Sequence, residues 1–423
     1  MFELLSALCY QTSMMKDFFK VTELSKVLAF AADFPPVRSE TVPLSSANGR
    51  ILAENLISDV NLPEFRRSTM DGFAVQAAST FGATEGNPSY LAVKGAVNMG
   101  ERPDFSIGPG EAAKISTGGM LPEGADGVIM IEHTAIIDEQ TIEAYRSAAP
   151  GQHVIEAGED FKKDAKILLA GRQIRPQEVG LLAAFGKTSV KVYKKPIIGI
   201  LSTGDEIVPI DQAPGPGEIR DINTYTLSGQ VQEAGGISLP YGIARDDFED
   251  LFNKCKQALA ETDMVLISGG SSVGTRDFTI DVLSALPDPS IIVHGISISP
   301  GKPTILAKSG SKAIWGLPGH VVSAMIVFSK VVRPFVEHIG GVPGQAKIEP
   351  RVKGRLSRNL SSAQGRVDFV RVRLVEEGGV VWAHPVLGKS GLIHTMVKAD
   401  GLIEIGINME GLEKETEVDV YLM

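Results

Sequence analysis

The chain has 423 residues, 43% hydrophobic and 22% charged, with a net charge of −10 at pH 7 and a pI near 5.3. This length allows two to four domains with separate cores, and the acidic balance argues against a nucleic-acid-binding protein, whose partner demands a basic surface. No apolar run is long enough to span a membrane. The two cysteines, Cys9 and Cys255, exclude a disulfide framework and a zinc site, which fits a cytoplasmic protein.

The N-terminal half is predicted to begin with a helix and to continue as short strands. Residues 16–33 place apolar side chains, among them Leu24 and Val27, on one helical face. From 34 to about 195, short alternating runs are cut by Gly and Pro, a pattern typical of small β-rich modules. One further helix is expected at 177–186, ending at Gly186.

From residue 194 onward, strands and helices alternate regularly. Strands are expected at 194–204, 237–244, 263–270, 291–299 and 313–319, and helices at 223–235, 246–261, 279–286 and 320–341. Asn223 is expected to cap the first of these helices, and Cys255 to lie on the buried face of the second. This alternation predicts a doubly wound parallel sheet.

The tail from residue 343 returns to a two-residue apolar period. A hairpin is expected around Gly378-Gly379, and a last strand at 417–423. These strands predict a compact β-barrel or sandwich. The fold class is therefore multidomain: a doubly wound α/β domain between β-rich N-terminal domains and a C-terminal β-barrel.

Small-residue loops with polar groups follow several strands of the predicted parallel sheet. Since the carboxyl ends of such strands meet at one edge, we expect these loops to converge on a phosphorylated small molecule. Glu206, Asp246 and Asp277 are carboxylates beside the loops, which indicates Mg²⁺ bound against phosphate oxygens. The predicted substrate-binding residues are Ser202, Thr203, Gly204, Gly269, Gly270, Ser271, Ser272, Lys302, Pro303 and Gly319.

Simpler structural roles compete with this interpretation. Asp246 and its neighbour Asp247 can cap the helix that follows them, and SGGSSVG at 268–274 can be a turn. A second group of polar loops in the N-terminal half, at 66–72, 116–119 and 158–160, is explained residue by residue by turn chemistry alone.

Taken together, the motifs identify a family. RRSTMDGFAV, KISTGGMLPEGADGVIMIE, GED, ILSTGDEIV, DIN, IARDD, SGGSSVGTRDFT, PGKP, GLPGH and RVDFVR occur in this order over residues 16–423. The sequence resembles the molybdopterin molybdenumtransferases, the family that includes the E-domain of gephyrin. The motifs are long and ordered, so the match is specific, although any one of them alone would be weak.

The resemblance implies four domains and a homodimer with an active site shared by both subunits. The expected domains are I (16–65 and 156–195), II (66–155), III (196–342) and IV (343–423). The implied activity inserts molybdate into adenylylated molybdopterin and releases AMP, with Mg²⁺ present. Because the substrate supplies its own dithiolene sulfurs, the protein needs no cysteine or histidine ligands.

The resemblance also assigns residues. Its catalytic acidic and hydroxyl positions correspond to Asp71, Thr117, Asp160, Glu206, Asp246 and Asp277. Its molybdate pocket corresponds to Lys302, Pro303, Arg371 and Ser390, donors that suit a tetrahedral dianion.

Three positions depart from the family pattern. Ser299 replaces a common Lys or Arg, residues 153–157 lack the usual arginines, and His320-Val321 replaces Asn-Pro. His320 is a better candidate than His294 to supply the charge missing at Ser299. Two rival functions remain open at this point: a dimeric scaffold that binds partner peptides, and an adenylyltransferase acting on molybdopterin. The choice between molybdate and tungstate is also open.

Overall fold

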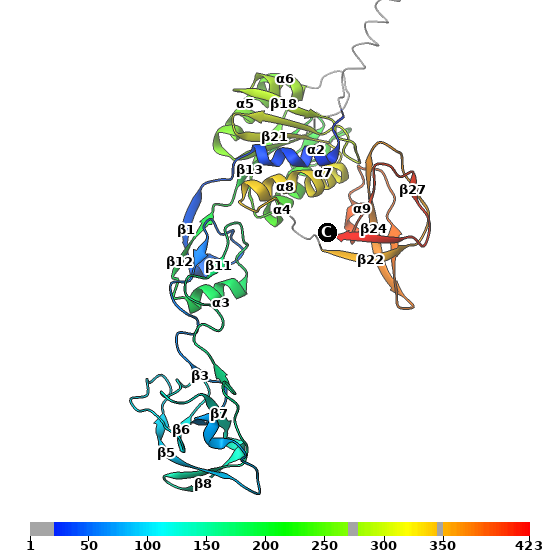
Figure 1. The fold of residues 1–423 in the computed structure, drawn as a ribbon. Coiled ribbons are helices and arrows are strands. Elements are labelled where there is room, and N and C mark those ends of the chain that lie inside the picture. The colour runs from blue at the N-terminus through cyan, green and yellow to red at the C-terminus, as the bar shows by residue number, and fades with distance from the viewer. Residues whose placement is uncertain (1–20, 270–277, 345–349) are drawn as a thin grey trace, which may run out of the picture. The chain divides into compact units, whose positions relative to one another are not determined.

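The computed structural model describes residues 21–269, 278–344 and 350–423. The chain forms two compact units (Figure 1). The larger unit contains the chain up to Val42, residues 47–53 and residues 191–423, and the smaller unit contains residues 43–46 and 54–190. Within the described ranges, every helix is too short or too polar to cross a membrane.

A six-stranded sheet organises the α/β part of the larger unit. Its strand order is β16-β13-β17-β21-β20-β18, with bounds Ile237–Ala244, Ile197–Thr203, Met264–Ser268, Lys312–Leu317, Ile305–Ser309 and Pro289–His294. The first four strands are parallel, as the alternating pattern predicts. Strands β20 and β18 form an antiparallel edge, which the alternating pattern does not predict, so the sheet is mixed.

Helices cover both faces of this sheet (Figure 1), which confirms the doubly wound arrangement. One face, with Ile198 and Leu266, packs with α2, α4, α7 and α8, and the other, with Leu201 and Val265, packs with α5 and α6. Side chains alternate between these faces along each strand because the strand period is two. The helix bounds are α2 Leu24–Ala29, α4 Asn223–Glu233, α5 Phe248–Glu261, α6 Phe278–Ala285, α7 Val321–Val327 and α8 Arg333–Ile339.

Several local predictions need correction or refinement. Of the helix expected at 16–33, residues 16–20 lie outside the described ranges, and within those ranges α2 covers only Leu24–Ala29. Residues 291–299 do not form one strand: β18 ends at His294, and β19 (Ile298–Ser299) pairs with a different sheet. Gly295, at φ 97°, allows the chain to turn between them. Cys255 is fully buried, as predicted, and burial raises the pKa of its thiol to about 12.

The C-terminal part of the larger unit is a closed five-stranded barrel. Strand β24 pairs with both β25 and β26, and β22 and β28 complete the ring. The bounds are β22 Arg351–Leu356, β24 Val367–Glu377, β25 Val380–Pro385, β26 Gly401–Ile405 and β28 Glu417–Leu422, with the short helix α9 at His394–Val397. The predicted hairpin turn at Gly378-Gly379 joins β24 to β25. The predicted barrel is confirmed.

The smaller unit is β-rich, as predicted. Its main sheet has the order β7-β4-β6-β5-β9-β8, with bounds Gly127–Met130, Gly72–Val75, Glu111–Ile115, Ser89–Val97, Thr141–Ala144 and Thr134–Asp138. Two buried clusters, one on each side of β4, form its core. Two small sheets pair β2 (Leu56–Ile57) with β11 (Lys166–Leu168) and β3 (Arg67–Ser68) with β10 (Val154–Ile155). Helix α3 (Pro176–Ala184) lies within two residues of its predicted bounds.

Candidate functional site

Three strand-end loops meet at the carboxyl edge of the α/β sheet. Gly269, after β17, packs on Thr203 at the end of β13: a Cβ built on Gly269 would lie 2.1 Å from Thr203 O. Gly319, after β21, approaches Gly269, since its Cβ would lie 3.6 Å from Gly269 Cα. The predicted convergence of these loops is therefore seen in the structure, and glycine is needed at position 269, where a Cβ would collide with the Thr203 carbonyl oxygen.

The hydroxyls of β13 are used inside the protein. Ser202 Oγ donates to Asp221 Oδ1 at 2.9 Å, and Thr203 Oγ1 donates to Asp246 Oδ1 at 3.0 Å. Both side chains are buried. The backbone N–H groups of Gly204 and Gly269 also donate internally, to Ala244 O and Leu317 O. These hydrogen bonds hold the loops in place.

The roles of two polar residues at the start of α4, Asp221 and Asn223, differ from the prediction. Asn223 does not cap α4. Its amide Nδ2 donates to Ser268 Oγ at 2.6 Å and to Gly319 O at 2.8 Å, tying two of the loops together. The cap is provided by Asp221, whose Oδ1 accepts the Thr224 N–H at 3.1 Å. Asn223 Oδ1 is buried with no hydrogen-bond partner among the described residues. In the sequence, the Asp-Ile-Asn run at 221–223 is the signal for both roles, the cap by Asp221 and the loop contacts of Asn223.

The two described carboxylates of the predicted metal set lie beside these loops. The Glu206 carboxylate folds back over Gly204, within 2.8–2.9 Å of where a Gly204 Cβ would lie. Asp246 does not cap α5, because Asp247 takes that role by accepting the Asp250 N–H at 3.0 Å. Asp246 is therefore available at the strand end, fixed by the Thr203 hydroxyl. The predicted residues Gly270, Ser271, Ser272 and Asp277 lie outside the described ranges.

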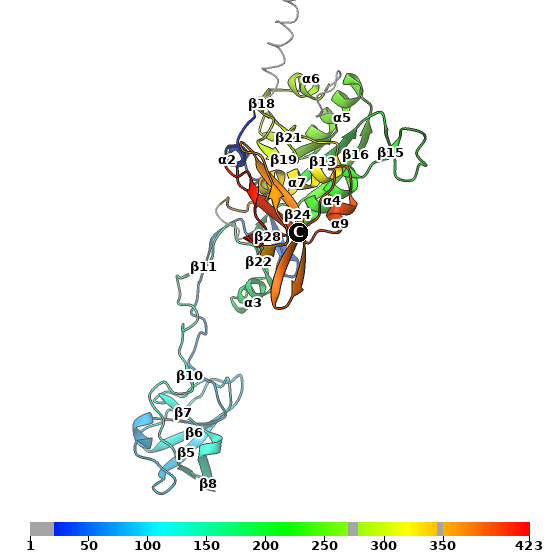
Figure 2. The same cartoon turned by 90° about the vertical axis from the view of Figure 1, so that its right-hand side faces the viewer.

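A pocket of about 590 Å³ opens beside Gly204. It is bordered by the loop between β14 (Ile207–Val208) and β15 (Ile219–Arg220), which projects from the edge of the sheet in Figure 2. Asp221, Thr224 and Tyr225 line its inner side. Its volume falls within the usual range of small-molecule sites.

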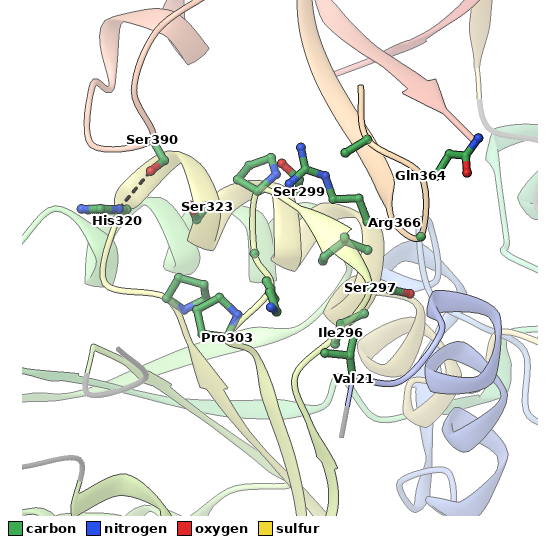
Figure 3. A pocket seen from close by; sticks show the side chains of 17 residues that line it. Val21, Ile296, Ser297, Ser299, Pro303, His320, Ser323, Gln364, Arg366 and Ser390 are labelled. Atoms are coloured by element: carbon green, nitrogen blue, oxygen red, sulfur yellow. Dashed lines mark hydrogen bonds between the residues drawn. The ribbon is translucent and has the colours of Figure 1, made fainter. Parts of the chain in front are cut away.

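A second pocket of about 590 Å³ lies where the α/β part meets the barrel, and we call it the junction pocket (Figure 3). Its polar lining residues are Ser297, Ser299, Lys302, His320, Ser323, Gln364, Arg366 and Ser390, and Pro303 also borders it. The structure thus brings together three of the four predicted molybdate residues: Lys302, Pro303 and Ser390.

Side chains in the junction pocket are linked to one another. Ser390 Oγ lies 2.9 Å from His320 Nδ1. Arg366 Nε lies 2.8 Å from Asp368 Oδ1, and in Figure 3 the Arg366 guanidinium points toward Ser299. Sequence reasoning missed Arg366 as a pocket residue, although it begins the quoted motif RVDFVR. The pairing of β19 with β24 sets Val367 beside Ile298 and Asp368 beside Ser299, and this brings the preceding residue, Arg366, to the pocket.

Arg371, the fourth predicted molybdate residue, is not among the residues that line the junction pocket. Its Nη1 donates to Thr395 Oγ1 at 2.8 Å and its Nη2 to Gly388 O at 3.0 Å. Both partners belong to the loop and short helix that carry Ser390. Burial lowers the pKa of Arg371 from its ordinary value. Arg371 therefore fastens the segment that presents Ser390.

The smaller unit carries the other three predicted positions. Asp71 Oδ1 accepts the backbone N–H of Thr117 at 2.8 Å, so these two residues lie together, and both are exposed. Asp160 is on another loop, where its N–H donates to Leu62 O at 3.0 Å. The structure thus unites Asp71 with Thr117 and places Asp160 at a separate turn of the same unit.

Comparison with known proteins finds three family models along the chain. Residues 20–186 match the MoeA N-terminal region (domain I and II), residues 199–338 a probable molybdopterin binding domain, and residues 353–423 the MoeA C-terminal region (domain IV). Together these matches extend over most of the sequence.

Individual relatives agree with the family models. A putative molybdopterin biosynthesis protein of Methanocaldococcus jannaschii is 37% identical over 90% of this chain and 92% of its own length. The molybdopterin molybdenumtransferase of Bacillus subtilis is 30% identical over 91% of this chain and 90% of its own length. Two solved structures of MoeA protein from Pyrococcus horikoshii match with TM-scores of 0.80 and 0.81, at 38% and 30% identity, covering 95% and 96% of this chain and 99% and 100% of theirs.

Proposed function

The chain belongs to the MoeA family and is a molybdopterin molybdenumtransferase of molybdenum cofactor biosynthesis, and on this premise we propose how its residues share the work. The reaction inserts molybdate into adenylylated molybdopterin and releases AMP. The observation that most directly supports this assignment of residue roles is the convergence of three strand-end loops, at Thr203, Gly269 and Gly319. They meet beside the carboxylates of Glu206 and Asp246. The ends of parallel strands are where such sheets bind phosphorylated ligands.

The carboxylates near Gly204 fit a magnesium ion. Glu206 and Asp246 offer hard oxygen donors on the loops that would face the phosphates, and Mg²⁺ prefers a few carboxylates plus phosphate oxygens. The described ranges contain no cluster of three or more potential ligands, and Asp277, the third predicted ligand, lies outside them. When bound, Mg²⁺ would neutralise charge on the leaving phosphate oxygen.

The junction pocket is the proposed molybdate site. Lys302 and Arg366 bring positive charge to it, while Ser390 and His320 bring hydrogen-bonding groups. A tetrahedral dianion is best held by several such donors. Arg371 serves the site indirectly, by holding the Ser390 segment through Gly388 and Thr395.

We assign Asp71, Thr117 and Asp160 to the same reaction, with both subunits of a homodimer contributing to the active site. An exposed apolar edge supports self-association. Strand β16 ends the α/β sheet, and Ile237 and Leu239 on it are 48% and 38% exposed. An open strand edge with apolar side chains is a common surface for pairing. The four-domain division and the cytoplasmic location are proposed from the sequence.

Release of AMP tests the assignment. The full-length protein is incubated with adenylylated molybdopterin and Mg²⁺, with molybdate, tungstate or neither, and AMP is quantified. We expect AMP only when an oxyanion is added, and a loss of release when EDTA removes the divalent cation. A scaffold protein would release no AMP, and an adenylyltransferase would instead form the adenylylated compound from ATP and molybdopterin.

A further inference from the structure

His320 and Ser390 come from separate elements and meet in the junction pocket. His320 is the residue before α7, and its side chain makes no capping bond to that helix. Ser390 lies in the loop after β25, where its carbonyl accepts the Val322 N–H at 3.0 Å. The 2.9 Å contact between Ser390 Oγ and His320 Nδ1 is the hydrogen bond drawn in Figure 3. The His320 imidazole therefore hydrogen-bonds with Ser390 and not with the helix that it precedes.

The direction of this hydrogen bond decides what Ser390 can offer to a ligand. If Nδ1 carries no proton, it can only accept a hydrogen bond, and the Ser390 hydroxyl donates its one proton to the imidazole. Ser390 Oγ then presents lone pairs to the pocket. If Nδ1 carries a proton, it donates to Oγ, and the hydroxyl proton is free to point elsewhere. A doubly protonated imidazole makes this second arrangement obligatory and adds a positive charge.

We propose that His320 is a positioning residue that turns the Ser390 hydroxyl into a donor for a tetrahedral oxyanion, so that oxyanion binding strengthens as His320 gains a proton. The inference rests on the proposed molybdate site and specifies how one of its donors is controlled. An asparagine at this position would supply a fixed N–H donor without a charge. Histidine in its place makes the donor dependent on pH.

Other charged groups also surround the junction pocket. Lys302 lines it from the loop after β19, and Arg366 from the position just before β24, where Asp368 pairs with it. Lys389 is adjacent to Ser390 in the chain. The ordinary pKa values of lysine, arginine and aspartate, ~10.4, ~12.5 and ~3.9, all lie outside the range from pH 5.5 to 8.5. Among the residues lining the pocket, histidine alone has an ordinary pKa inside this range.

The test measures binding of sodium molybdate to the full-length protein by calorimetry between pH 5.5 and 8.5. For the wild type we expect affinity to fall about tenfold across this range, the size of one charge-assisted hydrogen bond. His320→Asn should bind with little pH dependence, because the amide donates at every pH. His320→Ala and Ser390→Ala should bind weakly and also without a pH trend. His294→Ala, a histidine change on β18 away from the pocket lining, should keep the wild-type profile.

Rescue by asparagine separates positioning from a merely structural role. If His320→Asn retained the wild-type pH slope, or if His320→Ala bound molybdate as the wild type does, the inference would be overturned. It would also be overturned if the wild type bound no molybdate under any condition. Failure of the proposed function looks different: no AMP would be released from adenylylated molybdopterin, while the pH-dependent molybdate binding and its loss in His320→Asn persisted.

Discussion

The carboxylate of Glu206 occupies the space that a side chain on Gly204 would need. A Cβ on Gly204 would lie 2.8 Å from Glu206 Oε2 and 2.9 Å from Oε1. Gly204 also has φ +151°, a backbone conformation that favours glycine. The absence of a side chain at position 204 thus lets Glu206 reach back over the end of β13.

Replacing Glu206 with glutamine should abolish AMP release and leave the fold unchanged. The amide keeps the shape of the side chain but removes the negative charge needed to hold Mg²⁺ against the phosphates. AMP release with saturating Mg²⁺ is the measurement, with Glu233→Gln on the exposed end of α4 as the matched control. Near wild-type turnover of Glu206→Gln would show that the metal is held elsewhere.

Gly269→Ala should destabilise the larger unit more than a glycine substitution at an open position does. The new Cβ would lie 2.1 Å from Thr203 O, so strain and the backbone shift together should cost more than about 2 kcal/mol. Gly235→Ala is the control, since Gly235 also has positive φ but has nothing within 4 Å of its Cβ position. It should cost about 1 kcal/mol. Equal midpoints in urea denaturation would contradict the close approach.

Glu178→Gln should destabilise the smaller unit at pH 7 but not at low pH. Arg175 and Arg172, at 2.6 and 2.7 Å, lower the pKa of Glu178 to about 2. Because the folded pKa lies below the ordinary value of about 4.3, the stabilisation is present above pH 4.5 and is lost as pH falls toward 2.

Urea denaturation should therefore show a loss of about 1–3 kcal/mol for Glu178→Gln at pH 7, shrinking steadily from pH 4.5 downward. Glu54→Gln, an exposed glutamate of the same unit, should change little at either pH. A Glu178→Gln deficit that stayed constant between pH 7 and pH 2.5 would mean that the variant perturbs packing rather than the ion pairs.

Arg366 should supply the positive charge that Ser299 lacks. Both residues line the junction pocket, and the guanidinium points toward Ser299 (Figure 3). Arg366→Gln should raise the molybdate concentration for half-maximal AMP release about tenfold or more, whereas Arg366→Lys should lose less. Arg358→Gln in the same part of the chain is a control outside the pocket lining.

For the same reason, Ser299→Lys should raise the affinity for molybdate only modestly. With Arg366 already present, an added lysine should tighten molybdate use by less than the roughly ten- to hundredfold expected for a new charge-assisted hydrogen bond. In the Arg366→Gln background, Ser299→Lys should restore most of the lost affinity. Additive effects of the two substitutions would mean that the two positions act on different ligands.

Light scattering should give about twice the 45.1 kDa mass of one chain. Leu239→Lys, which places a charge on the exposed edge strand β16, should shift the protein toward the monomer. Val397→Lys changes an exposed apolar residue on α9 and should not. A wild-type protein that remained monomeric at micromolar concentration would argue against the dimer.

Regular elements with strong periodicity could be predicted from the sequence. Strand β17 is buried at every position, and its unbroken apolar run shows this directly. Helix α5 combines an Asp247 cap with Leu251, Cys255 and Leu259 on one face, and its bounds are within two residues of the prediction. In these cases local pattern and tertiary packing require the same structure.

Other features depend on partners that a linear sequence does not reveal. Strand β20 is short and lies between Pro303 and Gly310, so only its pairing with β18 and β21 defines it. Asn223 resembles a cap in sequence but binds two distant loops. The loops around Glu206 and Asp246 were predicted because parallel strands must end at one edge, whereas Arg366 enters the junction pocket through a strand pairing that no periodicity indicates.

The connection between β18 and β19 links the thermal unfolding of the α/β part to that of the barrel. Gly295 separates a strand of the α/β sheet from a strand that hydrogen-bonds to β24 of the barrel. Val367, Phe369 and Leu402 of the barrel share one buried cluster with Ile298 and Val327. The barrel is therefore not a detachable module, and heating should melt both parts in a single calorimetric transition.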